Sequence, residues 1–146
     1  MEHPSSSPEP PLVHWALFWR ALIAPLAVWG VLVSGALLTH QPGVVCITPM
    51  AWLLALWSGA RYVMLLDGPP DRYPLLAPAA IGAALGLGQG IIFIIVIAAD
   101  MPAATPDDLA RTRLLSVVMV AGGILVCAAL AAFIAWLRLH RFPRER

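Results

Sequence analysis

Four long, unbroken apolar blocks constrain this chain more than any other feature of its sequence. They run from Trp15 to Leu38, from Val44 to Leu66, from Leu75 to Ala99 and from Leu114 to Leu137. A helix that crosses about 30 Å of hydrocarbon needs roughly 20 predominantly apolar residues. The blocks lack the period-2 alternation of strands, and only a helix satisfies its own backbone hydrogen bonds in lipid. They therefore predict an all-α polytopic membrane protein, a bundle of four transmembrane helices joined by short loops.

The composition favours a membrane protein over a soluble domain. Hydrophobic residues make up 60% of the chain and charged residues only 12%, whereas a soluble domain carries about a quarter charged residues. The formal net charge is +1, and the basic residues lie at block edges rather than along one face. This pattern does not predict a nucleic-acid partner. We expect the lipid bilayer to be the main surroundings of the chain.

The sequence divides into a tail, a membrane domain and a second tail. Residues 1–14 are rich in Pro and Ser and predict a disordered tail. Glu2 and Glu9 stand where a signal peptide would carry basic residues, so we expect no cleaved leader. Residues 15–137 form the predicted four-helix membrane domain, and residues 138–146 form a basic C-terminal tail.

The arginines predict the orientation in the membrane. All nine basic residues are Arg, and Lys and Asn are absent, which we interpret as the codon bias of a GC-rich bacterial genome. Seven arginines fall on the side of the two termini and two on the other. Because positive charges near helix ends stay in the cytoplasm, we expect a protein of the bacterial cytoplasmic (inner) membrane with both termini inside.

The loop before the last block contains a helix-start signal. Thr105 can cap a helix whose first residue is Pro106, with Asp107 and Asp108 on the positive end of the helix dipole. The fourth helix is therefore predicted to begin several residues before it enters lipid.

Small residues recur at spacing four in two of the blocks. Helices in lipid approach closely where such residues let the backbones touch. The second block carries Ala51, Ala55 and Gly59, and the third carries Gly82, Gly86 and Gly90. Antiparallel neighbours would bring Gly59 to the depth of Gly82. We therefore predict that the second and third helices pack along these faces.

Ionisable residues are missing from all four block centres. Transporters and proton pumps usually need such a residue in the bilayer, so this absence argues against ion coupling. Arg20 and Arg61 lie four or five residues inside their blocks. Each can extend its guanidinium to the cytoplasmic edge and reach water there, which is the interpretation we favour. The alternatives are an ion pair with Asp67 or Asp71 and binding of a lipid phosphate.

Residues that could bind a ligand are few. Gln89 is the most polar side chain near the middle of a block. It could contact a ligand, but we favour an interhelical hydrogen bond, which is commoner for such residues. His14 and His140 fall at one level, but haem ligands are expected within the hydrophobic zone. Metal-ligand clusters are not evident, so we expect no cofactor, no metal and no catalytic residue.

Two function classes remain, with an enzyme ranked third. The first is a non-catalytic membrane subunit that packs within a larger membrane protein complex, in an accessory or assembly role, against other integral membrane subunits. The second is a small transporter or channel for a neutral or hydrophobic substrate, possibly homo-oligomeric, lined by Ser34, Thr48, Gln89 and the backbone freed at Pro25. An enzyme would rely on Asp67, Asp71 and Arg72.

Overall fold

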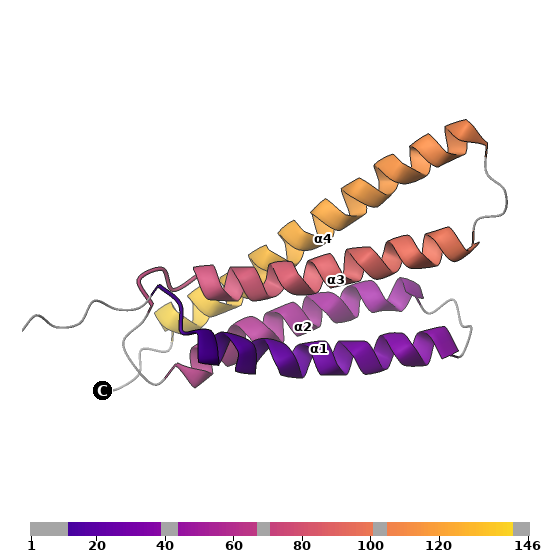
Figure 1. The fold of residues 1–146 in the computed structure, drawn as a ribbon. Coiled ribbons are helices and arrows are strands. Elements are labelled where there is room, and N and C mark those ends of the chain that lie inside the picture. The colour runs from indigo at the N-terminus through magenta and orange to yellow at the C-terminus, as the bar shows by residue number, and fades with distance from the viewer. Residues whose placement is uncertain (1–11, 39–43, 67–70, 101–104, 142–146) are drawn as a thin grey trace, which may run out of the picture.

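The structure is a computed structural model that describes residues 12–38, 44–66, 71–100 and 105–141. This part of the chain is all helical apart from short connecting stretches, which confirms the all-α part of the predicted fold class. The helices are α1 (Trp15–Leu38), α2 (Val44–Leu65), α3 (Leu76–Asp100) and α4 (Pro106–Arg141). Figure 1 shows them in order along the chain.

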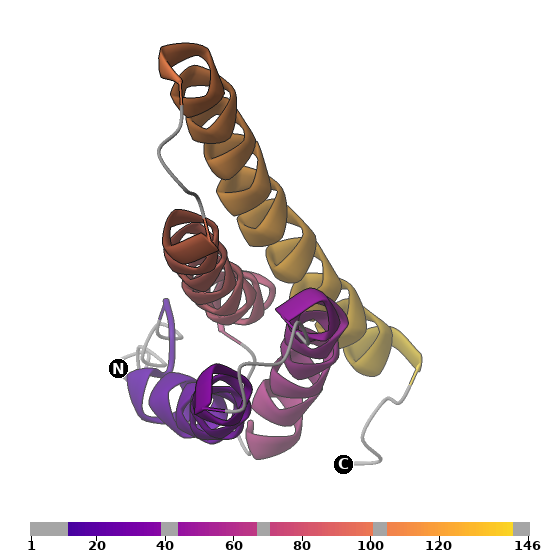
Figure 2. The same cartoon turned by 90° about the vertical axis from the view of Figure 1, so that its right-hand side faces the viewer.

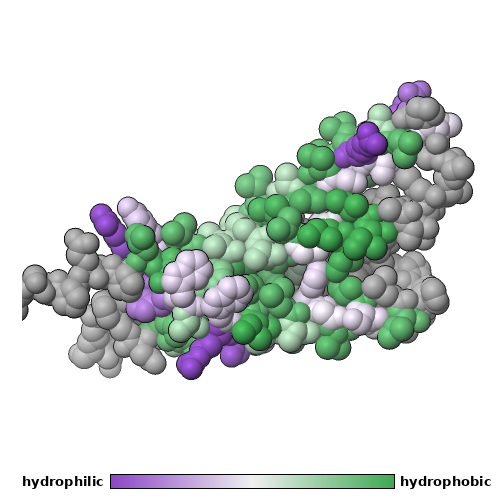
Figure 3. All heavy atoms as spheres, in the orientation of Figure 1, coloured by the Kyte–Doolittle hydropathy of each residue, from purple (hydrophilic) through white to green (hydrophobic). Residues whose placement is uncertain are grey.

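Three of these helices, α1, α3 and α4, are long and apolar enough to cross a membrane. Figure 3 shows hydrophobic side chains over the middle of one face, with hydrophilic residues toward the two ends. Water could not solvate so large an apolar surface, since soluble monomers rarely expose apolar patches above a few hundred Å². The protein is therefore membrane-embedded.

The long fourth helix begins at the predicted residue. Thr105 Oγ1 accepts a hydrogen bond from the Asp108 backbone N–H at 3.3 Å. Asp108 Oδ2 accepts one from the Thr105 backbone N–H, also at 3.3 Å. This reciprocal arrangement is a capping box, which satisfies backbone donors that a helix start leaves unpaired. The cap explains why α4, with 36 residues, is longer than its apolar block.

The two central helices separate the outer two. Helix α1 packs on α2 and on α3, whereas α4 packs on α3 and α2 from the other side. Within the described residues, α1 and α4 do not touch. Figures 1 and 2 show that the first part of α4, drawn in orange, diverges from α3, while its later part, drawn in yellow, lies against the bundle. The later part of α4 thus packs against the other helices more closely than its first part does.

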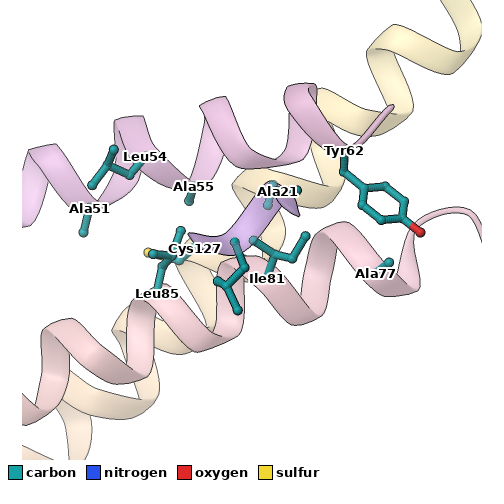
Figure 4. Packing of buried hydrophobic residues seen from close by; sticks show 11 residues of the cluster. Ala21, Ala51, Leu54, Ala55, Tyr62, Ala77, Ile81, Leu85 and Cys127 are labelled. Carbon is teal, nitrogen blue, oxygen red and sulfur yellow. The ribbon is translucent and has the colours of Figure 1, made fainter. Parts of the chain in front are cut away.

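The core joins all four helices near the end where α1 begins and α4 finishes (Figure 4). Much of it is alanine, so the helix axes can approach closely. Its buried members are Ala21, Leu22, Ala51, Leu54, Ala55, Tyr62, Ala77, Ile81, Leu85, Cys127 and Ala131. We call this end of the bundle, which also carries Asp71, the Asp71 end.

Candidate functional site: the faces of α4 and the Asp71 cluster

The glycine face of α3 lies directly on the backbone of α4. A Cβ added to Gly82 would lie 2.2 Å from the carbonyl oxygen of Cys127. One added to Gly86 would lie 2.3 Å from the carbonyl oxygen of Gly123. Real Cβ atoms essentially never come this close to backbone atoms, so only glycine permits the observed contact. A Cβ added to Gly90 would lie 2.7 Å from Cγ2 of Val120 and 2.9 Å from its Cα.

Gly59 of α2 makes the same kind of contact with α4. A Cβ on Gly59 would meet the carbonyl oxygen of Ala131 at 2.3 Å. The other small residues of this face, Ala51 and Ala55, are buried in the core. We name the contact of α4 with Gly59, Gly82, Gly86 and Gly90 the glycine seam.

The predicted pairing of Gly59 with the glycines of α3 does not occur. Helices α2 and α3 do touch, but the glycines of both face α4 rather than each other. Counting residues from a helix end fixes the depth of Gly59 and Gly82 at ~1.5 Å per residue. It cannot fix which neighbouring helix a face meets. Because α4 leans across both central helices, it takes the close approach that we assigned to the α2–α3 pair.

The opposite face of α4 is open. A Cβ added to Gly122 would have nothing within 4 Å. The exposed residues that share this face at helical spacing are Val118, Leu125, Ala129, Phe133 and Trp136. We call this set, with Gly122, the outer stripe of α4. Leu125 in its middle is 70% exposed. Helix α4 thus carries one packed face and one apolar face that has no neighbour among the described residues.

A buried carboxylate ties three segments together at the Asp71 end. Asp71 lies between α2 and α3 and is only 3% exposed. The Tyr62 hydroxyl, near the end of α2, donates a hydrogen bond of 2.5 Å to Asp71 Oδ2. His14, which precedes α1, contacts Asp71 Oδ1 through Nδ1. One carboxylate thus fixes the entry to α1, the end of α2 and the approach to α3.

Sequence reasoning missed this Asp71 cluster. We considered Asp71 only as an ion-pair partner of an arginine or as part of a candidate enzyme site. His14 lies 57 residues from Asp71 in sequence, and no local pattern predicts that contact. Tyr62 was the available signal, because a tyrosine at a helix end needs a partner for its hydroxyl when it is buried.

The Asp71 cluster brings an imidazole, a carboxylate and a phenol into contact. A carboxylate that holds an imidazole nitrogen is the arrangement of many general bases, and the His14 side chain is 30% exposed. However, no group of three or more His, Cys, Asp or Glu that could hold a metal occurs within the described ranges. His140, once considered as a partner of His14, instead has Nδ1 at 2.9 Å from the Trp136 carbonyl oxygen.

The two membrane-edge arginines differ in their surroundings. Arg20 is exposed. Arg61 is half-buried, with its Cζ 5.6 Å from the centroid of the Trp57 ring. Its Nε is fully buried and has no hydrogen-bond partner. Within the described part of the chain, the predicted pairing of either arginine with Asp71 does not occur, because His14 and Tyr62 occupy that carboxylate. Asp67 lies outside the described residues.

Gln89 lies beside the contact between α1 and α3. Its Oε1 atom is buried without a hydrogen-bond partner, as is the indole Nε1 of Trp29. The Trp29 ring lies against Gly88, since a Cβ on Gly88 would be 3.3 Å from its Cη2 atom. An interhelical hydrogen bond of Gln89 Oε1, which we favoured over a ligand contact, is thus not formed.

No protein-family model, curated protein or solved structure matches this chain.

Proposed function

We propose that this protein is a non-catalytic integral membrane subunit that packs within a larger membrane protein complex in an accessory or assembly role. All four helices span the membrane in this proposal. The observation that carries it is the difference between the two faces of α4. The glycine seam packs one face, whereas the outer stripe has no neighbour in the part of the chain that the structure describes.

Lipid alone could cover an apolar stripe, but two features favour a protein partner. First, Gly122 and Ala129 are small residues within the exposed stripe, and such residues serve close helix contact in membranes. Second, the first part of α4 extends away from α3 (Figure 2), so a helix that follows the outer stripe would contact α4 along most of its length. The partner we infer is another integral membrane protein that offers an apolar helix.

The proposed location is the bacterial inner membrane, with the Asp71 end in the cytoplasm. The arginines of that end support this orientation, because positively charged residues near helix ends remain inside. They are Arg20, Arg61, Arg72, Arg138 and Arg141. Arg111 and Arg113 belong to the other end, next to Asp107 and Asp108.

A purification tests the subunit role. The full chain is extracted from its native membrane in a mild detergent, and chains that co-purify in fixed stoichiometry are identified. We expect a larger assembly that Gly122→Trp disrupts, because the indole would occupy the outer stripe. Gly30→Trp is the matched control, since a Cβ on Gly30 also has nothing within 4 Å. A chain that is monomeric in both the extract and native membranes would overturn the proposal.

The buried polar atoms support a second candidate, a small transporter or channel for a neutral or hydrophobic substrate. Trp29 Nε1 can donate and Gln89 Oε1 can accept, and both lack a partner. Unpaired polar groups are costly in hydrocarbon, so a passing substrate with a hydroxyl or amide could pair with them. Ser34 does not contribute, because its hydroxyl donates to the Gly30 carbonyl of its own helix. The side chain of Thr48 lies outside the described residues. Flux into liposomes that contain only the purified chain would favour this candidate.

A further inference from the structure

One arginine lies on the exposed surface of α2 and has no anionic partner among the residues that the structure describes. The exposed residues of this surface are Leu53, Trp57 and Met64, at 59%, 42% and 51% exposure. Their helical spacing places Arg61 on the same stripe, between Trp57 and Met64. Arg61 is the fifth residue from the end of α2, so its Cα lies only ~6 Å along the axis from the last helical residue.

The guanidinium of Arg61 is partly shielded from solvent, and no carboxylate among the described residues balances its charge. The Trp57 ring lies 5.6 Å from its Cζ, a distance typical of cation–π contacts. The buried Nε has no hydrogen-bond acceptor, and within the described ranges no carboxylate lies within ion-pair distance of Arg61. An arginine stays charged at any accessible pH. A charged group so placed can bind an anion from outside the chain.

We propose that Arg61 and Trp57 form a binding site for the phosphate of an anionic phospholipid in the adjacent leaflet. A guanidinium binds phosphate through two parallel N–H···O bonds. Trp57 restricts the orientation of the guanidinium, and its ring belongs at the headgroup level, where indoles are enriched. The neighbouring Leu53 is apolar and exposed, so it can contact the acyl chain of the same lipid. The site does not depend on any protein partner of α4.

Arg20 provides a comparison at similar depth. It is the sixth residue of α1, which places it about as far from its helix end as Arg61 is from its own. Arg20 is exposed and has no ring contact within the described residues. Water and mobile ions can therefore neutralise Arg20, whereas the half-buried Arg61 is screened less. We expect a specific lipid at Arg61 and only nonspecific attraction at Arg20.

The test counts lipids retained by the purified full-length protein. Wild type, Arg61→Gln, Arg61→Lys, Trp57→Leu and Arg20→Gln are reconstituted in nanodiscs of phosphatidylcholine with one-fifth phosphatidylglycerol. Each is then transferred to detergent, and bound lipids are counted by native mass spectrometry. Thermal unfolding in detergent is followed in parallel with phosphatidylglycerol, with phosphatidylcholine or with inorganic phosphate. The last addition distinguishes a lipid headgroup from a free phosphate.

We expect wild type and Arg20→Gln to retain one phosphatidylglycerol, and Arg61→Gln to retain at least fivefold less. Trp57→Leu and Arg61→Lys should give intermediate retention. Each keeps the positive charge, but Trp57→Leu loses the ring against the guanidinium and Arg61→Lys loses the planar fork. Phosphatidylglycerol alone should raise the midpoint of unfolding of wild type. Equal retention by wild type and Arg61→Gln, or equal loss in both glutamine variants, would overturn the proposal. Stabilisation by inorganic phosphate to the same degree would also overturn a lipid as the ligand. If Arg61→Gln does not fold, the comparison of Arg61→Lys with wild type decides.

Discussion

Gly86 of α3 lies backbone to backbone against Gly123 of α4. The contact is asymmetric. A Cβ on Gly86 would lie 2.3 Å from the Gly123 carbonyl oxygen, whereas a Cβ on Gly123 would lie 3.3 Å from the Gly86 carbonyl oxygen. The first demands that α4 move, and the second needs a shift of only a few tenths of an ångström. Of these two glycines, Gly86 is therefore the more restrictive position.

Substitution of Gly86 tests the seam. Gly86→Ala should lower the free energy of unfolding by about 1–3 kcal/mol, the usual cost of an overpacked contact. Gly122→Ala is the control, because its Cβ meets nothing within 4 Å. Replacing an unobstructed helical glycine by alanine should be neutral or stabilising, by up to ~1 kcal/mol. Reversible unfolding in mixed micelles measures both. Equal stabilities of the two variants would show that α3 and α4 do not meet at Gly86.

The Asp71 cluster predicts a second stability effect. Asp71→Ala removes the acceptor of both Tyr62 and His14. Leaving buried polar groups unpaired costs about 1–3 kcal/mol, so the midpoint of thermal unfolding should fall. Arg72→Ala, at the next and exposed position, should have little effect.

A double-mutant cycle separates the hydrogen bond from a general effect of losing Asp71. Tyr62→Phe should destabilise wild type more than it destabilises Asp71→Ala, with a coupling of about 1 kcal/mol. Strict additivity of the two substitutions would contradict a direct bond between Tyr62 and Asp71.

The capping box predicts a local effect at the start of α4. Thr105→Ala removes the side-chain acceptor of the Asp108 N–H and should cost about 1 kcal/mol of helix stability. Amide hydrogen exchange should accelerate in the first turn of α4 and remain unchanged near Cys127. Leu109→Ala, an exposed side chain outside the cap, should not reproduce this change. Unaltered exchange in the first turn of Thr105→Ala would argue against the cap.

Local signals predicted the helices well. The apolar blocks gave α1 its bounds, Trp15 and Leu38, and gave the bounds of α2 and α3 to within one residue. Thr105 and Pro106 predicted the early start of α4. These features depend on hydrogen bonds and apolar surface within one segment, and therefore short stretches of sequence contain them.

Contacts between segments were harder to predict. The periodicity of Gly82, Gly86 and Gly90 identified a face suited to close packing, but periodicity does not name the partner helix. The contact of Asp71 with His14 links the chain before α1 to the loop before α3, and it depends on how all four helices assemble. The difference between Arg20 and Arg61 depends on local burial, which charge and depth in the sequence do not reveal.

The proposed function requires that the outer stripe of α4 contacts another membrane protein. Photocrosslinking in living cells tests this contact most directly. A photoreactive residue replaces Leu125, which is 70% exposed in the middle of this stripe, and crosslinked products are separated and identified. We predict one discrete adduct with another integral membrane protein, which disappears when Gly122→Trp is added. Adducts with lipid alone, or with a second copy of this chain alone, would contradict the accessory role.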